Sequence, residues 1–80
     1  MTHASEVRSF VSETFFVDDF ADDDSFLQTG IIDSTGMMEL VAFLERRFGI
    51  KIADEELVPE NLDSLANVCR FVSRKNAQAA

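Results

Sequence analysis

The sequence predicts a small all-α bundle with three main helices, one short third helix and a long first loop. Apolar residues recur at the spacing of one helix face in three segments, and no two segments alternate as a pair of β-strands would. Of the 80 residues, 46% are apolar and 28% are charged, which is typical of a folded domain and not of a disordered chain. We therefore expect a single domain over residues 1–80, with its core at about 4–75 and a frayed tail at 76–80.

The first helix is expected at about 4–16, where one helix face carries Val7, Phe10, Val11 and Thr14. A long connection follows over about 17–33. Its aspartate-rich part disfavours helix, because short acidic side chains compete for backbone hydrogen bonds. Apolar side chains still tether this connection to the core: Phe20, Phe26, Leu27, Ile31 and Ile32.

The second main helix is the clearest element of the sequence. It begins within residues 33–35, three good N-cap residues in a row, and it ends at Gly49, which suits a helix C-cap. Its core-facing stripe consists of Met37, Leu40, Val41, Leu44 and Phe48. The apolar surface is wider than one such stripe requires, because it also includes Met38, Ala42 and Phe43.

The last third of the chain holds the short helix and the third main helix. Pro59 stops the acidic segment 54–58, so we expect little more than one helical turn there. Residues 62–64 then offer an N-cap for the last helix. The buried face of that helix is expected to consist of Leu65, Val68, Cys69 and Val72.

The net charge limits the partners of this chain. Seven basic and fifteen acidic residues give a net charge of −8. This charge disfavours nucleic acid and acidic membrane surfaces, because binding to polyanions requires Lys and Arg. We expect partner proteins with basic patches, which an acidic surface attracts at long range. The longest uncharged apolar stretch, 40–44, is far shorter than the roughly 20 residues of a membrane span.

The sequence also favours a cytoplasmic protein. The first ten residues lack the basic and apolar regions of a signal peptide. Cys69 is the single cysteine, so no internal disulfide can form, and a reducing compartment is expected. Because the chain begins with Met1 and ends soon after the last helix, we expect a freestanding domain, and we expect it to be a monomer.

Residues for catalysis or metal binding are scarce, so the chain is not expected to be an enzyme. His3, the single histidine, lies at the start of the chain, where it is not held as a general base. A calcium loop beginning at Asp22 would place Phe26, Leu27 and Asp33 where a ligand, a glycine and a glutamate are needed. We therefore expect no metal site and interpret residues 22–24 as a solvated turn.

Ser34 is the residue with the most specific chemistry to offer. A serine at the start of a helix is most often simply an N-cap. The same place suits a covalently attached phosphate, because the N–H groups of the first turn are unpaired and the helix dipole favours negative charge. Position alone favours the cap.

The residues around Ser34 form a longer pattern. The motif Gly-Ile-Ile-Asp-Ser at 30–34 is followed by Glu39-Leu40-Val41 and Leu44-Glu45, and then by Phe-Gly-Ile-Lys-Ile at 48–52. Together with the small size, the acidity and the helix order, this pattern resembles the acyl carrier protein family over about 26–72. The hallmark of that family is Asp-Ser-Leu at the start of the second helix, with the serine carrying 4′-phosphopantetheine.

The resemblance implies roles for individual residues. Ser34 matches the phosphopantetheine attachment site, and Asp33 matches the acidic residue that contacts the transferase and its magnesium. Positions that contact partner enzymes are matched by two acidic and two apolar residues: Glu39, Glu45, Met38 and Ala42. Positions that form the core and line the acyl cleft are matched by Leu40, Leu44, Phe48, Ile52 and Val68.

A carrier of this kind performs no chemistry itself. The resemblance implies that a phosphopantetheinyl transferase modifies Ser34 from coenzyme A. Ligases, synthases or transferases with basic patches then load and remove an acyl or aminoacyl group held as a thioester. Four residues depart from the pattern of fatty-acid-synthesis carriers: Thr35, Gly36, Arg46 and Arg47. These departures favour a specialised pathway of lipid or polyketide type.

Three other interpretations remain open from the sequence. The first is a peptidyl or aminoacyl carrier, which shares this fold. The second is an acidic helical interaction module without a carrier role, in which Ser34 is only a cap. The third, a small enzyme or metal protein, is disfavoured by the missing base and ligands.

Overall fold

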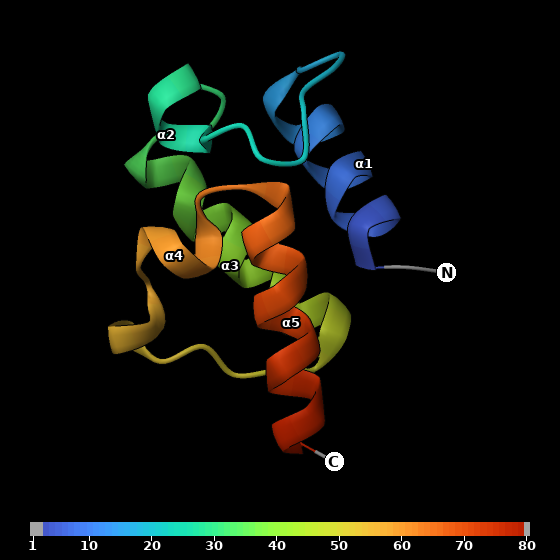
Figure 1. Ribbon diagram of the computed structural model, residues 1–80, viewed down its shortest axis with the longest axis vertical. Coiled ribbons are helices and arrows are strands. Elements are labelled where there is room, and N and C mark those ends of the chain that lie inside the picture. Colours follow the sequence, from blue (N-terminus) through green and yellow to red (C-terminus); the bar gives the residue numbers. More distant parts are fainter. Residues whose placement is uncertain (1–2, 80) are drawn as a thin grey trace.

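The computed structural model describes residues 3–79, which form five α-helices and one 3₁₀-helix and contain no strand. In chain order the elements are α1 (His3–Phe15), α2 (Phe26–Thr29), α3 (Ser34–Phe48), η1 (Asp54–Glu56), α4 (Pro59–Leu62) and α5 (Leu65–Ala79). Figure 1 follows them from the N-terminus in blue to the C-terminus in red. The predicted all-α bundle with three main helices is confirmed for the described residues.

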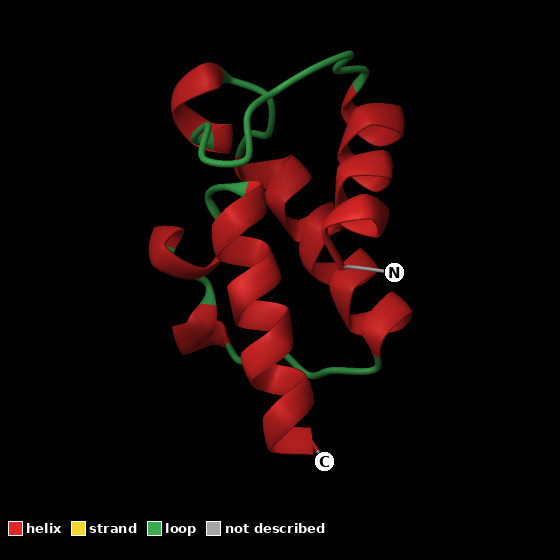
Figure 2. Cartoon of the chain, turned by 45° about the vertical axis from the view of Figure 1, so that its right-hand side comes forward, coloured by secondary structure: helices red, strands yellow, loops and turns green. Residues whose placement is uncertain are grey.

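The three long helices α1, α3 and α5 pack against one another, and α4 packs against α5. The loop from α1 to α2 crosses the end of the bundle at which α1 ends and α3 begins (Figure 2). The loop from α3 to η1 lies at the opposite end of the bundle. The first turn of α3 therefore lies beside α2, whereas η1 lies toward the opposite end of the bundle (Figure 1).

The core is apolar and draws on every long helix. Its members are Val7 and Val11 from α1, Leu40, Val41 and Leu44 from α3, and Leu65, Val68, Phe71 and Val72 from α5, with Phe20, Phe26, Ile32, Ile50 and Leu62 from the connecting segments. Phe71 is fully buried, whereas Cys69 is only half-buried. Cys69 still packs against the core, so the predicted face of the last helix is confirmed, but the prediction lacked Phe71.

The predicted long first loop contains a helix that the sequence analysis missed. The hydroxyl oxygen of Ser25 accepts a hydrogen bond from the Gln28 amide at 3.1 Å, and Gly30 ends α2 with a left-handed φ of 79°. The Phe26 amide donates to the Asp63 carbonyl at 2.7 Å, which ties α2 to the turn before α5. A serine cap and a glycine five positions later were the available signal.

The segment around Pro59 also differs from expectation. Pro59 does not stop the chain from being helical but is the first residue of α4, because a residue without an N–H group suits the start of a helix. The preceding turn, η1, ends at Glu56. The predicted cap of the last helix is confirmed, since the Ser64 hydroxyl oxygen accepts a hydrogen bond from the Asn67 amide at 3.1 Å. The helix then continues to Ala79, beyond the core boundary expected near residue 75.

Candidate functional site

The start of α3 is capped by Asp33 and not by Ser34. Asp33 has extended backbone angles, and its Oδ1 atom accepts a hydrogen bond from the Gly36 amide at 2.7 Å. Its carbonyl accepts the first bond of the helix, from the Met37 amide at 2.8 Å. Ser34 is consequently the first helical residue. The interpretation of Ser34 as a mere helix cap is therefore wrong.

The Ser34 side chain is exposed, and its hydroxyl has no hydrogen-bond partner among the described residues. The amide groups of Ser34 and Thr35 have no partner within α3, because they belong to the first turn. The positive end of the helix dipole lies at the same place. A phosphate joined to the Ser34 oxygen would therefore find free N–H donors and a favourable potential, so the site fits a phosphopantetheine group.

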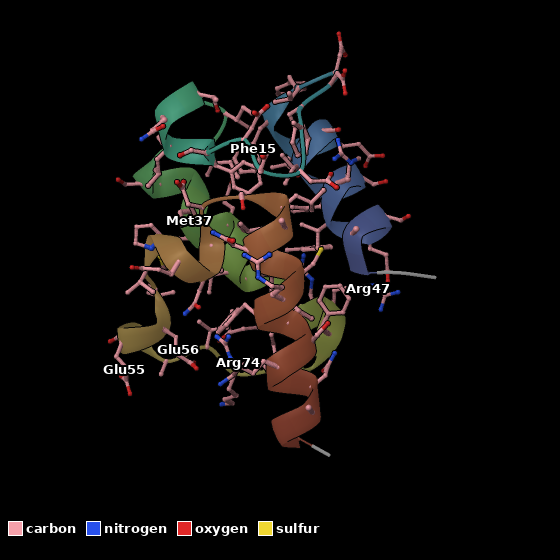
Figure 3. The ribbon with its side chains drawn as sticks, in the orientation of Figure 1. Phe15, Met37, Arg47, Glu55, Glu56 and Arg74 are labelled. Carbon is pink, nitrogen blue, oxygen red and sulfur yellow. The ribbon has the colours of Figure 1, made fainter. Side chains whose placement is uncertain are left out.

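The turn that bears Ser34 is held by α1 from one side. Gly36 is buried although it lies in the first turn of the helix, and Phe15 packs against it. Figure 3 labels Phe15 near the start of α3, at the end of α1. The ring of Phe15 also meets Phe10 edge to face, with centroids 6.1 Å apart, and Phe10 stacks on Phe43 at 4.1 Å. This aromatic row fixes the first turn of α3 relative to α1.

An apolar cavity of about 80 Å³ opens on the other side of this turn. Met37, one turn into α3, lies between α2 and α4, as Figure 3 indicates. The rest of the lining comes from α2 and from the segment around η1 and α4: Leu27, Leu57, Val58, Pro59, Leu62 and Asp63. Leu27 and Val58 are 45% and 36% exposed, so the cavity has an apolar rim.

The residues predicted to line an acyl cleft do not line this cavity. Leu40, Leu44 and Val68 are fully buried in the core, and Phe48 and Ile52 are half-buried against it. All five are therefore core residues, as expected. The cavity residues that follow η1 and those on α4 were missed, because the sequence analysis did not foresee that α4 would bring Leu62 toward α3.

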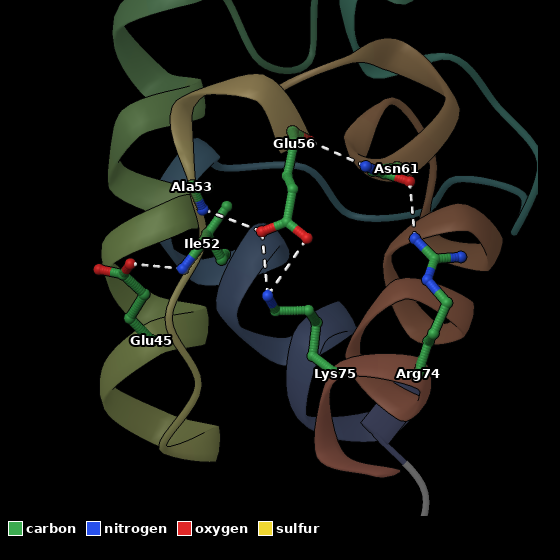
Figure 4. A network of polar contacts seen from close by, with 7 residues as sticks. All are labelled: Glu45, Ile52, Ala53, Glu56, Asn61, Arg74 and Lys75. Atoms are coloured by element: carbon green, nitrogen blue, oxygen red, sulfur yellow. Dashed lines mark hydrogen bonds and ion pairs between the residues drawn. The ribbon is translucent and has the colours of Figure 1, made fainter. Parts of the chain in front are cut away.

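One face of α3 is exposed beyond Ser34. It carries Met38, which is 55% exposed, and then Glu39, Ala42 and Arg46, at helical spacing. Glu45 lies at the edge of this face and is half-buried, and its Oε2 atom accepts a hydrogen bond from the Ile52 amide at 2.9 Å (Figure 4). Three of the four predicted partner contacts, Met38, Glu39 and Ala42, are thus open to solvent, whereas Glu45 also holds the loop after α3.

A polar network ties η1 to α5 (Figure 4). The carboxylate of Glu56 accepts hydrogen bonds from the Ala53 amide at 2.9 Å and from Lys75 Nζ at 3.0 and 3.2 Å. The backbone bond and the ammonium group of Lys75 lower the pKa of Glu56 below its ordinary value. The Glu56 carbonyl also accepts from Asn61 Nδ2 at 2.9 Å, and Asn61 Oδ1 accepts from Arg74 at 3.1 Å.

The described residues hold no metal cluster and no helix long and apolar enough to cross a membrane. In the aspartate-rich turn, Asp22 pairs with Arg8, and Asp24 Oδ2 accepts a bond from the Ala21 amide at 2.9 Å. These acidic groups therefore have structural partners. Burial, followed by the negative charge of Asp22, raises the pKa of the Cys69 thiol.

Comparisons with known proteins show the family of this chain. Residues 5–72 match the family model described as phosphopantetheine attachment site. The chain is 40% identical over 57 residues to proteins named acyl carrier protein from Arthrobacter sp. (strain FB24) and from Paenarthrobacter aurescens (strain TC1). Each match covers 71% of this chain and 65% of the relative, so the chain spans just under two thirds of the length of these relatives.

The matched region runs from α1 into α5, so it includes the whole helical bundle, and the class of protein is a domain that bears phosphopantetheine. The chain belongs to the acyl carrier protein family of phosphopantetheine attachment domains. Its cofactor is a covalently attached 4′-phosphopantetheine.

Proposed function

We propose that Ser34 is the attachment residue and that the chain carries an acyl group between partner enzymes without catalysing a reaction. The observation that supports this most directly is the division of roles at the start of α3. Asp33 caps the helix, and the neighbouring Ser34 hydroxyl is exposed and free of hydrogen bonds among the described residues. A free, exposed hydroxyl is accessible to a transferase, and its modification breaks no contact of the fold.

The first turn of α3 prepares the site for a phosphate. The amide groups of Ser34 and Thr35 point out of the helix end, and the helix dipole lowers the energy of a negative charge there. Asp33 Oδ1 is used in the cap, whereas Oδ2 of this exposed carboxylate takes no part in it and is available to the transferase and its magnesium. When bound, the phosphopantetheine group supplies a terminal thiol that holds an acyl group as a thioester.

The apolar cavity beside Met37 favours an acyl cargo over an aminoacyl cargo. Its lining is apolar apart from Asp63, and it begins one helical turn from Ser34. A charged amino group would lose hydration in such a cavity, whereas a hydrocarbon chain would gain burial. An acyl group that is partly sheltered here would still be released easily, because Leu27 and Val58 leave the rim open.

A specialised lipid or polyketide-type pathway is favoured over primary fatty-acid synthesis. Gly36 and Arg46 replace acidic residues that fatty-acid-synthesis carriers tend to have, and each has its own structural setting here. Gly36 makes room for Phe15, and Arg46 adds a positive charge to the exposed face of α3. Partner enzymes therefore meet a surface on α3 that is less acidic than the corresponding surface of fatty-acid-synthesis carriers.

Intact-mass measurement tests the proposed function. The chain is incubated with a broad-specificity phosphopantetheinyl transferase, magnesium and coenzyme A, beside Ser34→Ala and the matched control Thr35→Ala, which removes the neighbouring hydroxyl. We expect the mass of one phosphopantetheine to be added to the parent and to Thr35→Ala, and nothing to Ser34→Ala. No addition to the folded parent, with the transferase active on a control carrier, would favour the interaction module instead.

A further inference from the structure

The Lys and Arg side chains of this chain differ in whether they contact another group of the protein. Five of the seven Lys and Arg side chains contact an acidic, amide or aromatic group: Arg8, Arg47, Arg70, Arg74 and Lys75. Arg46 and Lys51 are the two that have no ion pair, hydrogen bond or ring contact among the described residues, and both are exposed. This is unexpected for a chain of net charge −8, in which acidic partners are abundant.

Both of these cations line one hollow. It is open, has a volume of about 470 Å³, and lies at the end of α3 and the loop that follows, where its lining consists of Ala42, Glu45, Arg46, Gly49, Ile50 and Lys51. Glu45, whose Oε2 atom accepts the hydrogen bond from Ile52, is the one carboxylate in this lining, so the two cations outnumber it. The hollow is therefore a positive spot on an acidic protein.

The hollow continues the exposed face of α3 that begins at Ser34. Ala42 and Arg46 belong both to that face and to the hollow. Arg46 lies twelve residues after Ser34, which is roughly 18 Å along the helix. A standard protein interface covers about 800 Å² on each partner, a patch with a radius of roughly 16 Å. Such a patch is roughly 32 Å across, so an interface that extends along this face from Ser34 is long enough to cover Arg46 as well.

Glu39 and Arg46 give the face two ends of opposite charge. They are seven residues apart, so they share one side of α3 at a separation of roughly 10 Å, with the apolar Met38 and Ala42 between or beside them. A cation that is covered by a partner loses its hydration, which costs free energy unless an acidic group replaces the water. The charge pattern thus specifies what the partner must present at each end.

We propose that the enzymes that act on this carrier dock on it with a bipolar surface. A basic group lies opposite Glu39, near the serine, and an acidic side chain enters the hollow between Arg46 and Lys51. The proposal rests on the proposed function, because it takes Ser34 as the residue that the enzymes must reach. The two opposite charges also fix the direction in which α3 lies on the enzyme, since the reversed direction would bring like charges together.

Kinetics with the same broad-specificity phosphopantetheinyl transferase test this proposal. KM and kcat for modification are measured for the parent, Arg46→Glu, Lys51→Glu and the double variant at low salt and at 0.5 M NaCl. Arg70→Glu is the matched control, because Arg70 is an exposed cation on α5, away from the hollow. Thermal melts confirm that each variant is folded.

We expect the double variant to raise KM about tenfold at low salt, with kcat within about twofold and the effect smaller at 0.5 M NaCl. Arg70→Glu should leave KM unchanged. An unchanged or lower KM in the double variant would overturn the bipolar surface, while modification of Ser34 would still support the carrier function. A parent that takes up no phosphopantetheine would instead overturn the proposed function, so the two failures are distinguishable.

Discussion

Phe15 at the end of α1 lies so close to Gly36 in α3 that a Cβ atom on residue 36 would be 2.6 Å from Phe15 Cε1. It would also lie 3.2 Å from Asp33 Oδ1, the atom that caps the helix. Glycine is a poor helix residue, but this contact requires it. Because residue 36 has no side chain, Phe15 of α1 can pack against the turn that bears Ser34.

Gly36→Ala tests this contact directly. Alanine gains about 1 kcal/mol of helix propensity over glycine, but overpacking against Phe15 costs about 1–3 kcal/mol, so we expect a net loss of about 1 kcal/mol in the free energy of unfolding. The loss in the free energy of unfolding is measured by urea unfolding. In the background Phe15→Leu, which removes the ring, Gly36→Ala should no longer destabilise. An equal loss in both backgrounds would show that the ring is not responsible.

Asp33 and Ser34 should respond differently to substitution. Asp33→Ala loses the cap and should lower the free energy of unfolding by about 1 kcal/mol, whereas Ser34→Ala should change it by less than about 0.5 kcal/mol. Asp33→Asn keeps a good capping side chain without the charge, so it should retain stability but slow phosphopantetheine transfer. A slow transfer to Asp33→Ala alone, with normal transfer to Asp33→Asn, would assign Asp33 to the cap only.

Phe16 should be replaceable with a gain in stability. It follows α1 with a left-handed φ of 57° and is 91% exposed, and the Val17 amide beyond it donates to the Ser12 carbonyl at 3.1 Å. Glycine is the usual residue at this position of a helix end. We expect Phe16→Gly to stabilise the fold by about 0.5–1 kcal/mol, because the strain relieved exceeds the added chain entropy. Phe16→Ala, which keeps the strain, should not stabilise it.

The Glu56 contacts should make stability depend on pH. Since the pKa of Glu56 is lower in the folded state, the unfolded chain binds the proton more readily, and acid favours unfolding. The contribution is present above the ordinary glutamate pKa of about 4.3 and is lost as the pH falls through the lowered value. Glu56→Gln should therefore lower the urea midpoint of unfolding at pH 7. In acid, the midpoints of the variant and the parent should become similar. Glu55→Gln, at the exposed neighbouring residue, is the matched control (Figure 3).

The thiol of Cys69 should be slow to react in the folded protein. Burial and the charge of Asp22 raise its pKa, so little thiolate is present near pH 8. We expect iodoacetamide to alkylate the native apo chain about tenfold more slowly than the urea-unfolded chain, as followed by intact mass. Similar rates for both would mean that the half-buried thiol is open to reagents.

The sequence predicted those features that depend on spacing along the chain. The periodic apolar residues and the C-cap at Gly49 were sufficient to place α3. The N-cap at Ser64 was sufficient to place the start of α5. The motif at 30–34 was sufficient to place the candidate site at the start of α3. Each of these is a local pattern, in which a few neighbouring residues determine the structure.

Features that depend on tertiary contacts escaped prediction. The one-turn helix α2 is held by Asp63, which is far away in the sequence, so its short pattern was not distinctive. Leu57 and Leu62 line the cavity only because α4 begins at Pro59 and packs against α5. Glu45 was expected at a partner interface, and nothing in the sequence indicated that it holds the Ile52 amide.

The cap at Asp33 leaves the start of α3 independent of the Ser34 hydroxyl. Because Ser34 contributes no hydrogen bond to the described fold, a group attached to its hydroxyl replaces no contact at the start of α3. A bare, modified or loaded serine then leaves the same helix in the same register. With the proposed attachment at Ser34, a partner enzyme would then distinguish loaded from empty carriers by the cargo and not by a change in the helix at this point.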